Sequence, residues 1–357
     1  MSTDRYRSYG LPWGGKIGKN VTDCTTSREV LEKANLDFQV EKCELFAQMP
    51  FRINGDNSIN ETMGDFAHNG EIYRPCPNGY ATYRTDKNIP LGVVKSKYEV
   101  VQNIDAFNFI DSAIGKDKAM FQYAGCFGFG HKVFITAKLP ITTTVGNDPI
   151  DNYLVFSTSH DGTSSIDILF TPVRVFCLNC LSAGIKEADA HIRIRHTKTA
   201  QERLTFGAEM LRVALKYAEH SKELYESLLT IKMNDDKVRD YISRLVLSPA
   251  EYASVCAEFK DHTIRKIFNR DYLTMEKNGI STRKANILNT IFDYYQTGVA
   301  QEKILGTAWG AYNAITGYYS NVKEQDGEKR MNNLVFGGDR LSMNKALNEV
   351  IMFRDAA

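Results

Sequence analysis

Long apolar runs are missing from this chain, and so is any excess of charge of one sign. The formal net charge is +1 over 357 residues, and the first residues, MSTDRYR, are polar. A helix that spans a bilayer needs about 20 consecutive apolar residues, and the opening segment has no signal-peptide pattern. A net charge near zero gives no global field that would attract nucleic acid or membranes, so such binding requires a local patch. We therefore expect a cytoplasmic protein with no membrane contact.

Several motifs that carry catalysis or cofactor binding are also missing. The sequence has no GxxxxGKS/T phosphate-binding loop, no HExxH helix and no GxSxG elbow. Its acidic residues are scattered, without the paired set that a two-metal nuclease needs. We therefore expect a protein that is not an enzyme and that holds no cofactor and no metal ion. An enzyme with an unrecognised site around His160, Asp161 and Arg174 is the less favoured alternative.

Cysteine is present, but in no pattern that forms a familiar site. The seven cysteines are irregularly spaced, and Cys177 and Cys180 form the only C-x-x-C pair. A zinc site needs two more ligands at similar spacing, and a redox site needs the pair at the start of a helix after a strand. Both remain alternatives, but free thiols are favoured, as in other proteins of reducing compartments.

Periodicity divides the chain into three regions. Residues 1–90 are mixed, and the run 69–90 is expected to be a loop with one short strand at 80–84. Residues 91–200 contain segments in which apolar side chains alternate, which is the pattern of half-buried strands. Residues 201–357 change to a period of 3.6 residues, which predicts helices. We predict an α+β fold, with a central antiparallel sheet and packed helices followed by a helical C-terminal half.

Cap and turn signals indicate where helices begin. Ser27 and Asn103 are each expected to cap a short helix, and Ser342 to cap the last one. The string Ser248-Pro249-Ala250-Glu251 combines a cap, a proline in the first turn and an early acid, which is a strong start signal. The helices of the last region are expected near 204–229, 236–247, 249–260, 282–297, 300–320 and 342–353.

Ser159, His160 and Asp161 stand side by side and resemble a catalytic set in residue type only. The members of a catalytic triad come from separate elements that converge in space, and neighbouring strand side chains point in opposite directions. Asp161-Gly162 is a preferred dipeptide of tight β-hairpin turns. We predict a hairpin turn between two strands, with His160 in a structural or ligand-orienting role and not as the base of a nucleophile.

The segment from Gly125 to Gly130 places Phe127 and Phe129 among glycines. It is not a GxGxxG motif and it precedes a strand, so dinucleotide binding is disfavoured. It faintly resembles the aromatic strand on which some RNA-binding sheets stack bases, so Phe127 and Phe129 are candidate base-stacking residues. Packing of these aromatic rings in the core is the favoured interpretation.

The segment HIRIRH at 191–196 alternates basic and apolar side chains, so a strand puts its basic residues on one face. Cations also protect sheet edges from aggregation, which makes a solvated edge the alternative to a binding surface. The neighbouring aromatic-rich strands favour contact with phosphates. Arg174, flanked by two valines, can serve the same surface or pair with a carboxylate. The candidate nucleic-acid-binding residues are Arg174, His191, Arg193, Arg195, Lys198 and Arg203.

Several strings together resemble one protein family. They include Leu91-Gly92-Val93-Val94, Ser159-His160-Asp161-Gly162, Phe170-Thr171-Pro172-Val173-Arg174-Val175 and the segment from Gly306 to Thr316. Over nearly its whole length the chain is similar to phage- and plasmid-encoded proteins grouped as domain of unknown function 932. The resemblance implies a mobile-element protein with a role in DNA metabolism, in the host cytoplasm if a phage encodes it. Cys180 departs from the family pattern, so the C-x-x-C pair is not expected to be a family site.

The leading hypothesis is a nucleic-acid-binding protein of a phage or mobile element that acts in DNA recombination or replication. Its concrete form is single-strand annealing, in which a cationic groove follows single-stranded DNA while aromatic side chains stack on bases. The alternative is a non-enzymatic interaction protein, such as an inhibitor of host defence or a virion component. Large apolar side chains in the tail helices predict a homo-oligomer, because such residues often anchor interfaces. They are Trp309, Tyr312, Tyr318, Tyr319, Leu347 and Ile351.

The cysteine pattern makes a first testable prediction. Alkylation of the denatured protein without reductant is expected to label all seven cysteines, because thiols stay reduced in the cytoplasm. Mass spectrometry counts the labels. A stable disulfide in the mass spectrum, or stoichiometric zinc by elemental analysis, would contradict this expectation.

Overall fold

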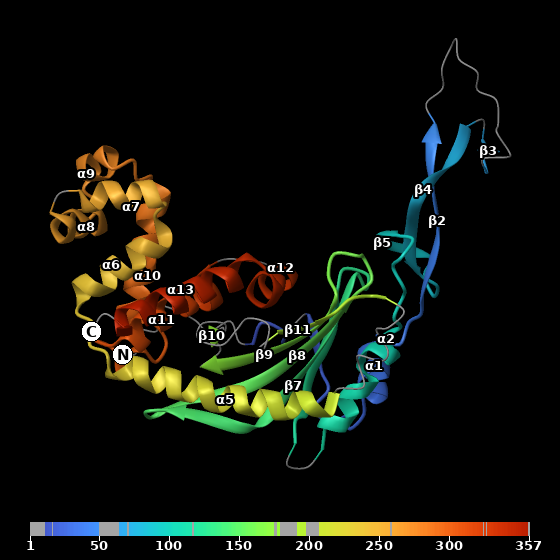
Figure 1. The fold of residues 1–357 in the computed structure, drawn as a ribbon, viewed down its shortest axis with the longest axis horizontal. Coiled ribbons are helices and arrows are strands. Elements are labelled where there is room, and N and C mark those ends of the chain that lie inside the picture. The colour runs from blue at the N-terminus through green and yellow to red at the C-terminus, as the bar shows by residue number, and fades with distance from the viewer. Residues whose placement is uncertain are drawn as a thin grey trace, which may run out of the picture.

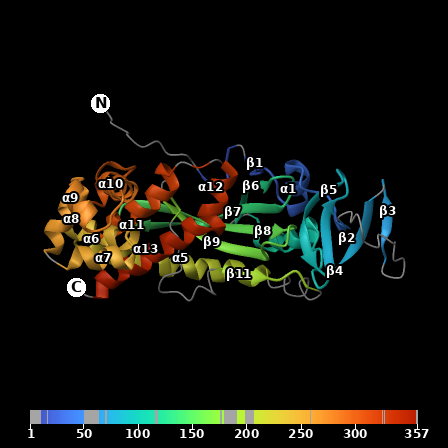
Figure 2. The same ribbon diagram turned by 90° about the horizontal axis from the view of Figure 1, so that it is seen from above.

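The computed structural model describes residues 11–15, 17–49, 64–69, 71–115, 118–174, 177–178, 191–197, 207–257, 259–323, 325 and 327–355. Figure 1 shows a U-shaped molecule: a large sheet and the long helix α5 (Gly207–Thr230) form its base, with a helical lobe at one end and a β-rich arm at the other. Figure 2 shows the same elongated arrangement from above. The α+β prediction, with a helical C-terminal half, is confirmed.

The larger sheet is antiparallel throughout. Its strand order is β1-β6-β7-β8-β9, and both β10 and β11 pair with β9. The strands predicted around 131–139 and 166–170 are confirmed as parts of β7 and β9. The seven strands are β1 (Gly18–Asn20), β6 (Met120–Phe127), β7 (Lys132–Val145), β8 (Asp148–Ser159), β9 (Ile166–Arg174), β10 (Cys177–Leu178) and β11 (His191–Ile194).

Both faces of this sheet are covered. Side chains such as Val133 and Phe156 belong to a core that also includes residues of the N-terminal helices and of α5. The opposite face carries Phe134 and Val155, which pack with Trp13 and with the C-terminal helices. The covering elements are α1 (Ser27–Ala34), α2 (Asn103–Phe107), η2 (Asn108–Ala113) and α5 on one face, and α12 (Gly327–Met331), η5 (Asn332–Phe336) and α13 (Gly338–Asp355) on the other.

The helical lobe has its own core, which is continuous with one end of α5 and with α11 and α13. The start signal at Ser248 is confirmed as a capping box with Glu251. Ser342 is not a cap, because α13 begins at Gly338 and the Ser342 hydroxyl donates to the Gly338 carbonyl within the helix (3.0 Å). The remaining elements are α6 (Asp235–Val246), α7 (Pro249–Cys256), α8 (Lys260–Phe268), α9 (Tyr272–Lys277), α10 (Thr282–Thr297), η3 (Gln301–Lys303), α11 (Ala308–Gly317) and η4 (Tyr318–Val322).

The arm is a second antiparallel sheet, and here the sequence-based expectation was wrong. The run 69–90 was expected to be mostly loop, but 71–84 form one long strand that pairs with three others. A proline and a glycine in this run mark an irregularity. The register shifts between Pro75 and Tyr80, and the residues between them include Pro77 and Gly79, where the ladder tolerates a residue without an N–H. The strands are β2 (Val40–Met49), β3 (Phe66–His68), β4 (Glu71–Arg84) and β5 (Ile89–Lys95).

Of the large tail side chains that predicted an interface, three lie inside the protein, and Tyr318, Tyr319 and Ile351 are partly buried against the same core. Trp309, Tyr312 and Leu347 are fully buried in the core of the helical lobe. They therefore give no support to an interface, and assembly into a homo-oligomer stays a prediction. None of the helices in the described part of the chain is long and apolar enough to span a membrane.

A tight joint connects the arm to the larger sheet. The Thr82 hydroxyl of β4 donates to the carbonyl of His160 (2.5 Å), just after β8. Gly92 of β5 lies against the backbone of Asp161, where an added Cβ would approach the Asp161 Cα to 2.5 Å. A side chain at position 92 would therefore push the two sheets apart.

His160 is buried in this joint, as its expected structural role requires. Its Nε2 lies 2.7 Å from Oδ1 of Asn103, whose Nδ2 donates to the Leu36 carbonyl (2.8 Å). Because that oxygen is an acceptor, His160 carries its proton on Nε2 and donates it. Asn103 thus connects the segment after α1 to the turn after β8 and does not cap α2. The cap residue is Gln102, which makes no side-chain cap bond. Ser27 is likewise one residue inside α1, which Thr26 caps.

A second buried histidine, His196, lies close to the first. Its ring stacks on Tyr98 (4.8 Å between centroids), and neither ring nitrogen has a hydrogen-bond partner among the described residues. Burial, reinforced by the charge of the other histidine, lowers the pKa of His160 to about 3. Burial also lowers the pKa of His196 to about 4. Both rings are therefore neutral in the folded protein at neutral pH.

This histidine pair predicts acid sensitivity. Below pH ~6.5 the unfolded chain takes up a proton on each histidine, whereas the folded protein does not. Stability is therefore fully present above that pH and falls towards pH 4, by up to about 1.4 kcal/mol per pH unit for each histidine. Urea unfolding between about pH 7 and pH 5, where most carboxylates stay ionised, measures this slope.

The variant His196→Phe provides the control. It removes one ionisable ring, keeps an aromatic ring against Tyr98 and breaks no ring hydrogen bond. We expect the free energy of unfolding of this variant to change with pH about half as steeply as that of the native protein, whatever the absolute stability of the variant. An unchanged slope would show that His196 does not contribute.

Candidate anion-binding site

The strand β11 presents its basic side chains as its sequence pattern predicts. Arg193 and Arg195 are exposed, whereas Ile194 and His196 are buried. The Arg193 guanidinium contacts the carboxylate of Asp167 on the neighbouring strand β9 (3.2 Å). His191 lies at the start of β11, opposite Leu169 of β9. Two further candidates, Lys198 and Arg203, lie outside the described residues.

Arg174 does not belong to this surface. Its side chain is 1% exposed, and its guanidinium pairs with the buried carboxylate of Asp148 and donates to the Ala300 carbonyl (2.8 Å). The proposed contact between Arg174 and nucleic acid is therefore corrected: this arginine joins the end of the sheet to the helical lobe. The pairing with a carboxylate, the alternative expected from the sequence, is what the structure contains.

The two phenylalanines are in different environments. Phe127 ends β6, is half-buried and packs on Phe134 (5.9 Å between ring centroids). Phe129 is 59% exposed in the turn between β6 and β7. They form no common platform for bases. Phe127 fits the core interpretation, whereas the exposure of Phe129 contradicts it.

The hairpin predicted at Asp161-Gly162 is confirmed, with a loop that spans residues 160–165 between β8 and β9. The Asp161 carboxylate accepts from the Ser159 hydroxyl (2.5 Å) and from the backbone N–H and hydroxyl of Thr163 (2.9 and 2.6 Å). Burial opposes ionisation, but these hydrogen bonds and the nearby Lys132 charge outweigh it and lower the pKa of Asp161. Asp161 is thus an ionised acceptor that fixes the loop.

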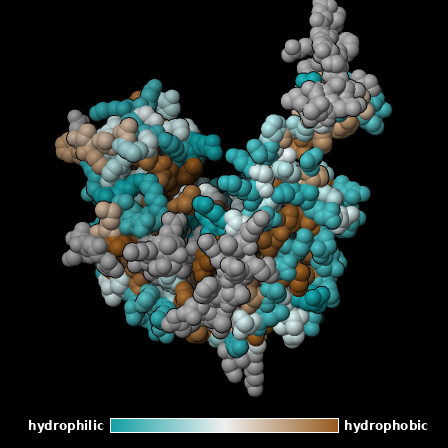
Figure 3. All heavy atoms as spheres, turned by 45° about the vertical axis from the view of Figure 1, so that its right-hand side comes forward, coloured by the Kyte–Doolittle hydropathy of each residue, from teal (hydrophilic) through white to brown (hydrophobic). Residues whose placement is uncertain are grey.

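A basic cavity opens beside this loop. Its volume is about 430 Å³, and three cations line it together with a single acid. The elements that form it, which include β11, η5 and α13, meet on the concave side of the U (Figure 1). Figure 3 shows the hollow between the helical lobe and the arm on this side. The lining residues are Lys132, Thr163, Ser164, Ser165, Asp167, Arg193, Asn332, Phe336 and Arg340.

Lys132 is the unusual residue of the basic cavity. It is only 8% exposed, and its ammonium lies over the Phe336 ring (4.5 Å to the centroid). It makes no hydrogen bond or ion pair with the residues that the structure describes. Burial lowers the pKa of Lys132, against the opposing charges of Asp161 and Asp167. A buried cation without a bound anion is costly, so this position suits an anionic ligand.

Other groups in the basic cavity provide further hydrogen-bond donors. Arg340 of α13 has no ion-pair partner within the described ranges. The Ser164 hydroxyl is buried without a partner among the described residues. Cations, hydroxyls and an aromatic ring together form a donor set for phosphate oxygens.

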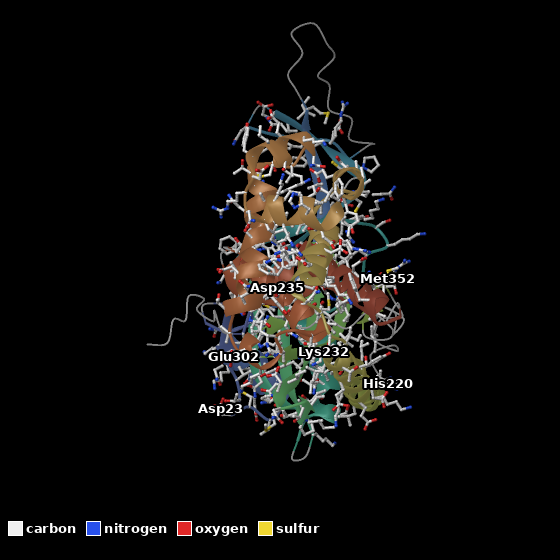
Figure 4. The ribbon with its side chains drawn as sticks, turned by 90° about the vertical axis from the view of Figure 1, so that its left-hand side faces the viewer. Asp23, His220, Lys232, Asp235, Glu302 and Met352 are labelled. Atoms are coloured by element: carbon white, nitrogen blue, oxygen red, sulfur yellow. The ribbon has the colours of Figure 1, made fainter. Side chains whose placement is uncertain are left out.

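A second cavity is larger but electrically neutral. It has a volume of about 700 Å³ and lies at the start of α6, around Asp235, which Figure 4 labels. Its arginines are already paired: Arg239 contacts Asp236 (3.1 Å), and Arg265 contacts the same carboxylate. These groups satisfy one another, so this cavity has no unpaired charge to offer a ligand.

No group of three metal-ligating side chains occurs within the ranges that the structure describes. Cys177 lies in β10, and Cys180 is outside the described residues. The free-thiol prediction therefore depends on the chemical test above.

A protein-family model matches most of this chain. The model named Domain of unknown function (DUF932) matches residues 90–347. The chain belongs to this family. The matched range runs from β5 to α13, so it contains every residue that lines the basic cavity and leaves most of the arm outside. Searches of curated proteins and of solved structures found no match.

Of the nine residues that line the basic cavity, sequence reasoning found only Arg193. The eight that it missed include Lys132 and three C-terminal residues, Asn332, Phe336 and Arg340. One signal was present, because Lys132 begins a strand whose next residue, Val133, faces the opposite, apolar side. For the three C-terminal residues the sequence offers no comparable signal, since their contact with β7 spans about 200 residues of chain.

Lys132 and Arg174 are both buried cations, but we predict opposite effects on stability when they are replaced. Lys132→Met removes a buried charge that has no ion pair, so we expect the free energy of unfolding to stay equal or to rise by up to about 1 kcal/mol. Arg174→Met leaves the buried Asp148 carboxylate without its ion-pair partner and should lower the free energy of unfolding by about 3–5 kcal/mol. Urea unfolding at neutral pH measures both. A loss for Lys132→Met as large as that for Arg174→Met would mean that Lys132 is a structural ion-pair residue and not a ligand-binding one.

Proposed function

We propose that this protein binds single-stranded nucleic acid, holds a backbone phosphate in the basic cavity, and acts in DNA recombination or replication. The observation that carries the proposal is Lys132, a buried cation without an ion pair that lines an open cavity. Phosphodiester oxygens are the acceptors that lysine, arginine and serine donors bind in nucleic-acid complexes.

The surroundings of the basic cavity support a polymer as ligand. Arg193 lines the cavity, and Arg195 is exposed two residues further along the chain, just after β11, so cations continue beyond the cavity mouth. A cationic path beside an aromatic ring is the pattern of proteins that bind single strands with little sequence preference. Phe336 is the ring in a position to contact a base, and it replaces Phe127 in that role.

The cavity volume favours a second candidate, a small phosphorylated molecule. About 430 Å³ lies within the range of about 300–1,000 Å³ that is typical of small-molecule sites. A competition experiment distinguishes a polymer ligand from a small phosphorylated one. If the ligand is a polymer, a free mononucleotide should displace a bound oligonucleotide only weakly, because the polymer makes additional contacts at Arg195.

The proposal predicts how binding responds to salt and charge reversal. The affinity for a fluorescent oligothymidylate should fall as salt rises, with a slope of about 0.7 for each phosphate neutralised. The double variant Arg193→Glu/Arg195→Glu should bind more weakly and show a shallower slope, because fewer counterions are released. Fluorescence anisotropy at several salt concentrations measures both.

A matched control changes the net charge equally at another place. Lys216→Glu/Lys237→Glu reverses two exposed lysines on α5 and α6, neither of which lines the basic cavity. It should retain nearly the native slope. If the native protein fails to bind the oligonucleotide at roughly 50 mM salt, a condition that favours even non-specific contact, the proposal fails and a non-enzymatic interaction protein becomes the better account.

A further inference from the structure

A groove on the arm lies outside the basic cavity, and the proposed function does not yet use it. This arm groove has a volume of about 770 Å³, and it is lined by residues 77–79 of β4 and by residues 93–97, which end β5 and begin the turn after it. All of these residues fall in one continuous described range, 71–115. Figure 1 shows β5 on the side of the arm that faces the helical lobe. The arm groove is larger than the basic cavity (about 430 Å³) and is wide enough for a ligand.

The cations of the arm groove are exposed and lie on one face. Lys95 ends β5 and Lys97 follows two residues later, and both side chains are exposed. Alternate residues of an extended chain point to the same side, so the two ammonium groups continue the row that Val93 begins. Neither lysine forms an ion pair with a described residue, and no carboxylate belongs to the described lining of the arm groove. The charge of the arm groove is therefore complementary to phosphate.

The arm groove also has an apolar part. Val93 is 63% exposed, whereas its neighbour Val94 is 6% exposed and packs in the joint with the larger sheet. Lysines on an edge strand protect it from aggregation, and β5 pairs with β4 alone among the described strands. That protection needs no exposed apolar side chain beside the lysines. Apolar surface next to lysines can contact the bases and sugars of a single strand while the lysines bind its phosphates.

The loop after β8 separates the arm groove from the basic cavity and contacts both. At Gly162 an added Cβ would approach Cγ1 of Val94 to 2.9 Å and the carbonyl oxygen of Val93 to 3.3 Å. The next residue, Thr163, lines the basic cavity. The two hollows are therefore neighbours on opposite sides of one short loop.

A second contact brings the cations of the two hollows into one row. The Glu99 N–H donates to the carbonyl of His196 (3.2 Å), so the chain just after the arm groove lies beside the end of β11. Arg195 directly precedes His196, and Lys97 precedes Glu99 by two residues. From the basic cavity to the arm groove the exposed cations follow in the order Arg193, Arg195, Lys97 and Lys95.

We propose that the arm groove is a second contact for the same single strand, which leaves the basic cavity past Arg195 and runs along β5. Backbone phosphates lie at Lys97 and Lys95, and a base or sugar lies against Val93. A row of cations suits a polymer, because a polymer carries phosphates at successive positions. This inference rests on the proposed function, and it determines how much of the strand the protein covers.

The test compares a short and a long oligonucleotide on the full chain. The probes are fluorescent oligothymidylates of about 4 and about 16 nucleotides, the limits of the site sizes that are typical of single-strand-binding modules. The short probe occupies the basic cavity, whereas the long probe continues to the arm groove. The salt slope of the long probe should be steeper by at least about 1.4, because two further phosphates contribute about 0.7 each. Fluorescence anisotropy at several salt concentrations measures both slopes.

The variant Lys95→Glu/Lys97→Glu locates the second contact. It should weaken binding of the long probe by about tenfold at roughly 50 mM salt and remove the additional slope, while the affinity for the short probe stays native. Both side chains are exposed, so the fold should persist, and unchanged binding of the short probe reports this. The control Lys216→Glu/Lys237→Glu, an equal charge change at exposed lysines of α5 and α6, should keep the native affinity for both probes.

The possible failures are distinguishable. Native affinity of Lys95→Glu/Lys97→Glu for the long probe would overturn this inference and leave the proposed function standing, with the lysines as protection of a strand edge. An equal loss for both probes, or an equal loss in the control variant, would also overturn it, because the effect would not be local to the arm groove. If the native protein binds neither probe, the proposed function fails and this inference fails with it.

Discussion

The burial of the larger sheet on both faces determines where this protein can place charge. One face packs with α1, α2, η2 and α5, and the other with Trp13 and the C-terminal helices. A charge between such layers is costly unless a counter-ion accompanies it. Arg174 follows this rule through its ion pair with Asp148. Lys132 departs from it, because its ammonium lies over an aromatic ring and makes no ion pair with the residues that the structure describes.

Lys132 lies where the layer of helices that covers the sheet ends. The start of β7, the loop after β8 and the edge strand β11 meet η5 and α13 there, and the space between them is the basic cavity. The same helices that bury Phe134 and Val155 therefore also position Phe336 and Arg340. The C-terminal helices therefore both cover the sheet and complete the basic cavity. The cavity exists only when these helices are docked on the sheet.

Local sequence patterns predicted much of the architecture. Alternating apolar residues identified β7 and β9, and the signal at Ser248 and the helix at 282–297 matched the structure closely, because caps and periodicity act over a few residues. The arm was missed because turn-forming residues lie within β4, where an irregular register absorbs them.

The site was predicted only in part, and the reason is distance along the chain. Arg193 was found because its alternation with isoleucines is a local pattern, and its exposure agrees. Arg174 was assigned to the surface because its partner, Asp148, is invisible in a local pattern. Lys132 and Arg340 are about 200 residues apart, and only the docked C-terminal helices bring them to one cavity.

Chemical protection of Lys132 tests the central claim most directly. Limited acetylation followed by mass spectrometry reports the reactivity of each lysine with and without a saturating oligothymidylate. The account predicts that the oligonucleotide protects Lys132 strongly while the reactivity of Lys216, on the opposite side of the sheet, stays the same. Equal acetylation of Lys132 in the presence and absence of a bound oligonucleotide would contradict the claim that the basic cavity holds the phosphate.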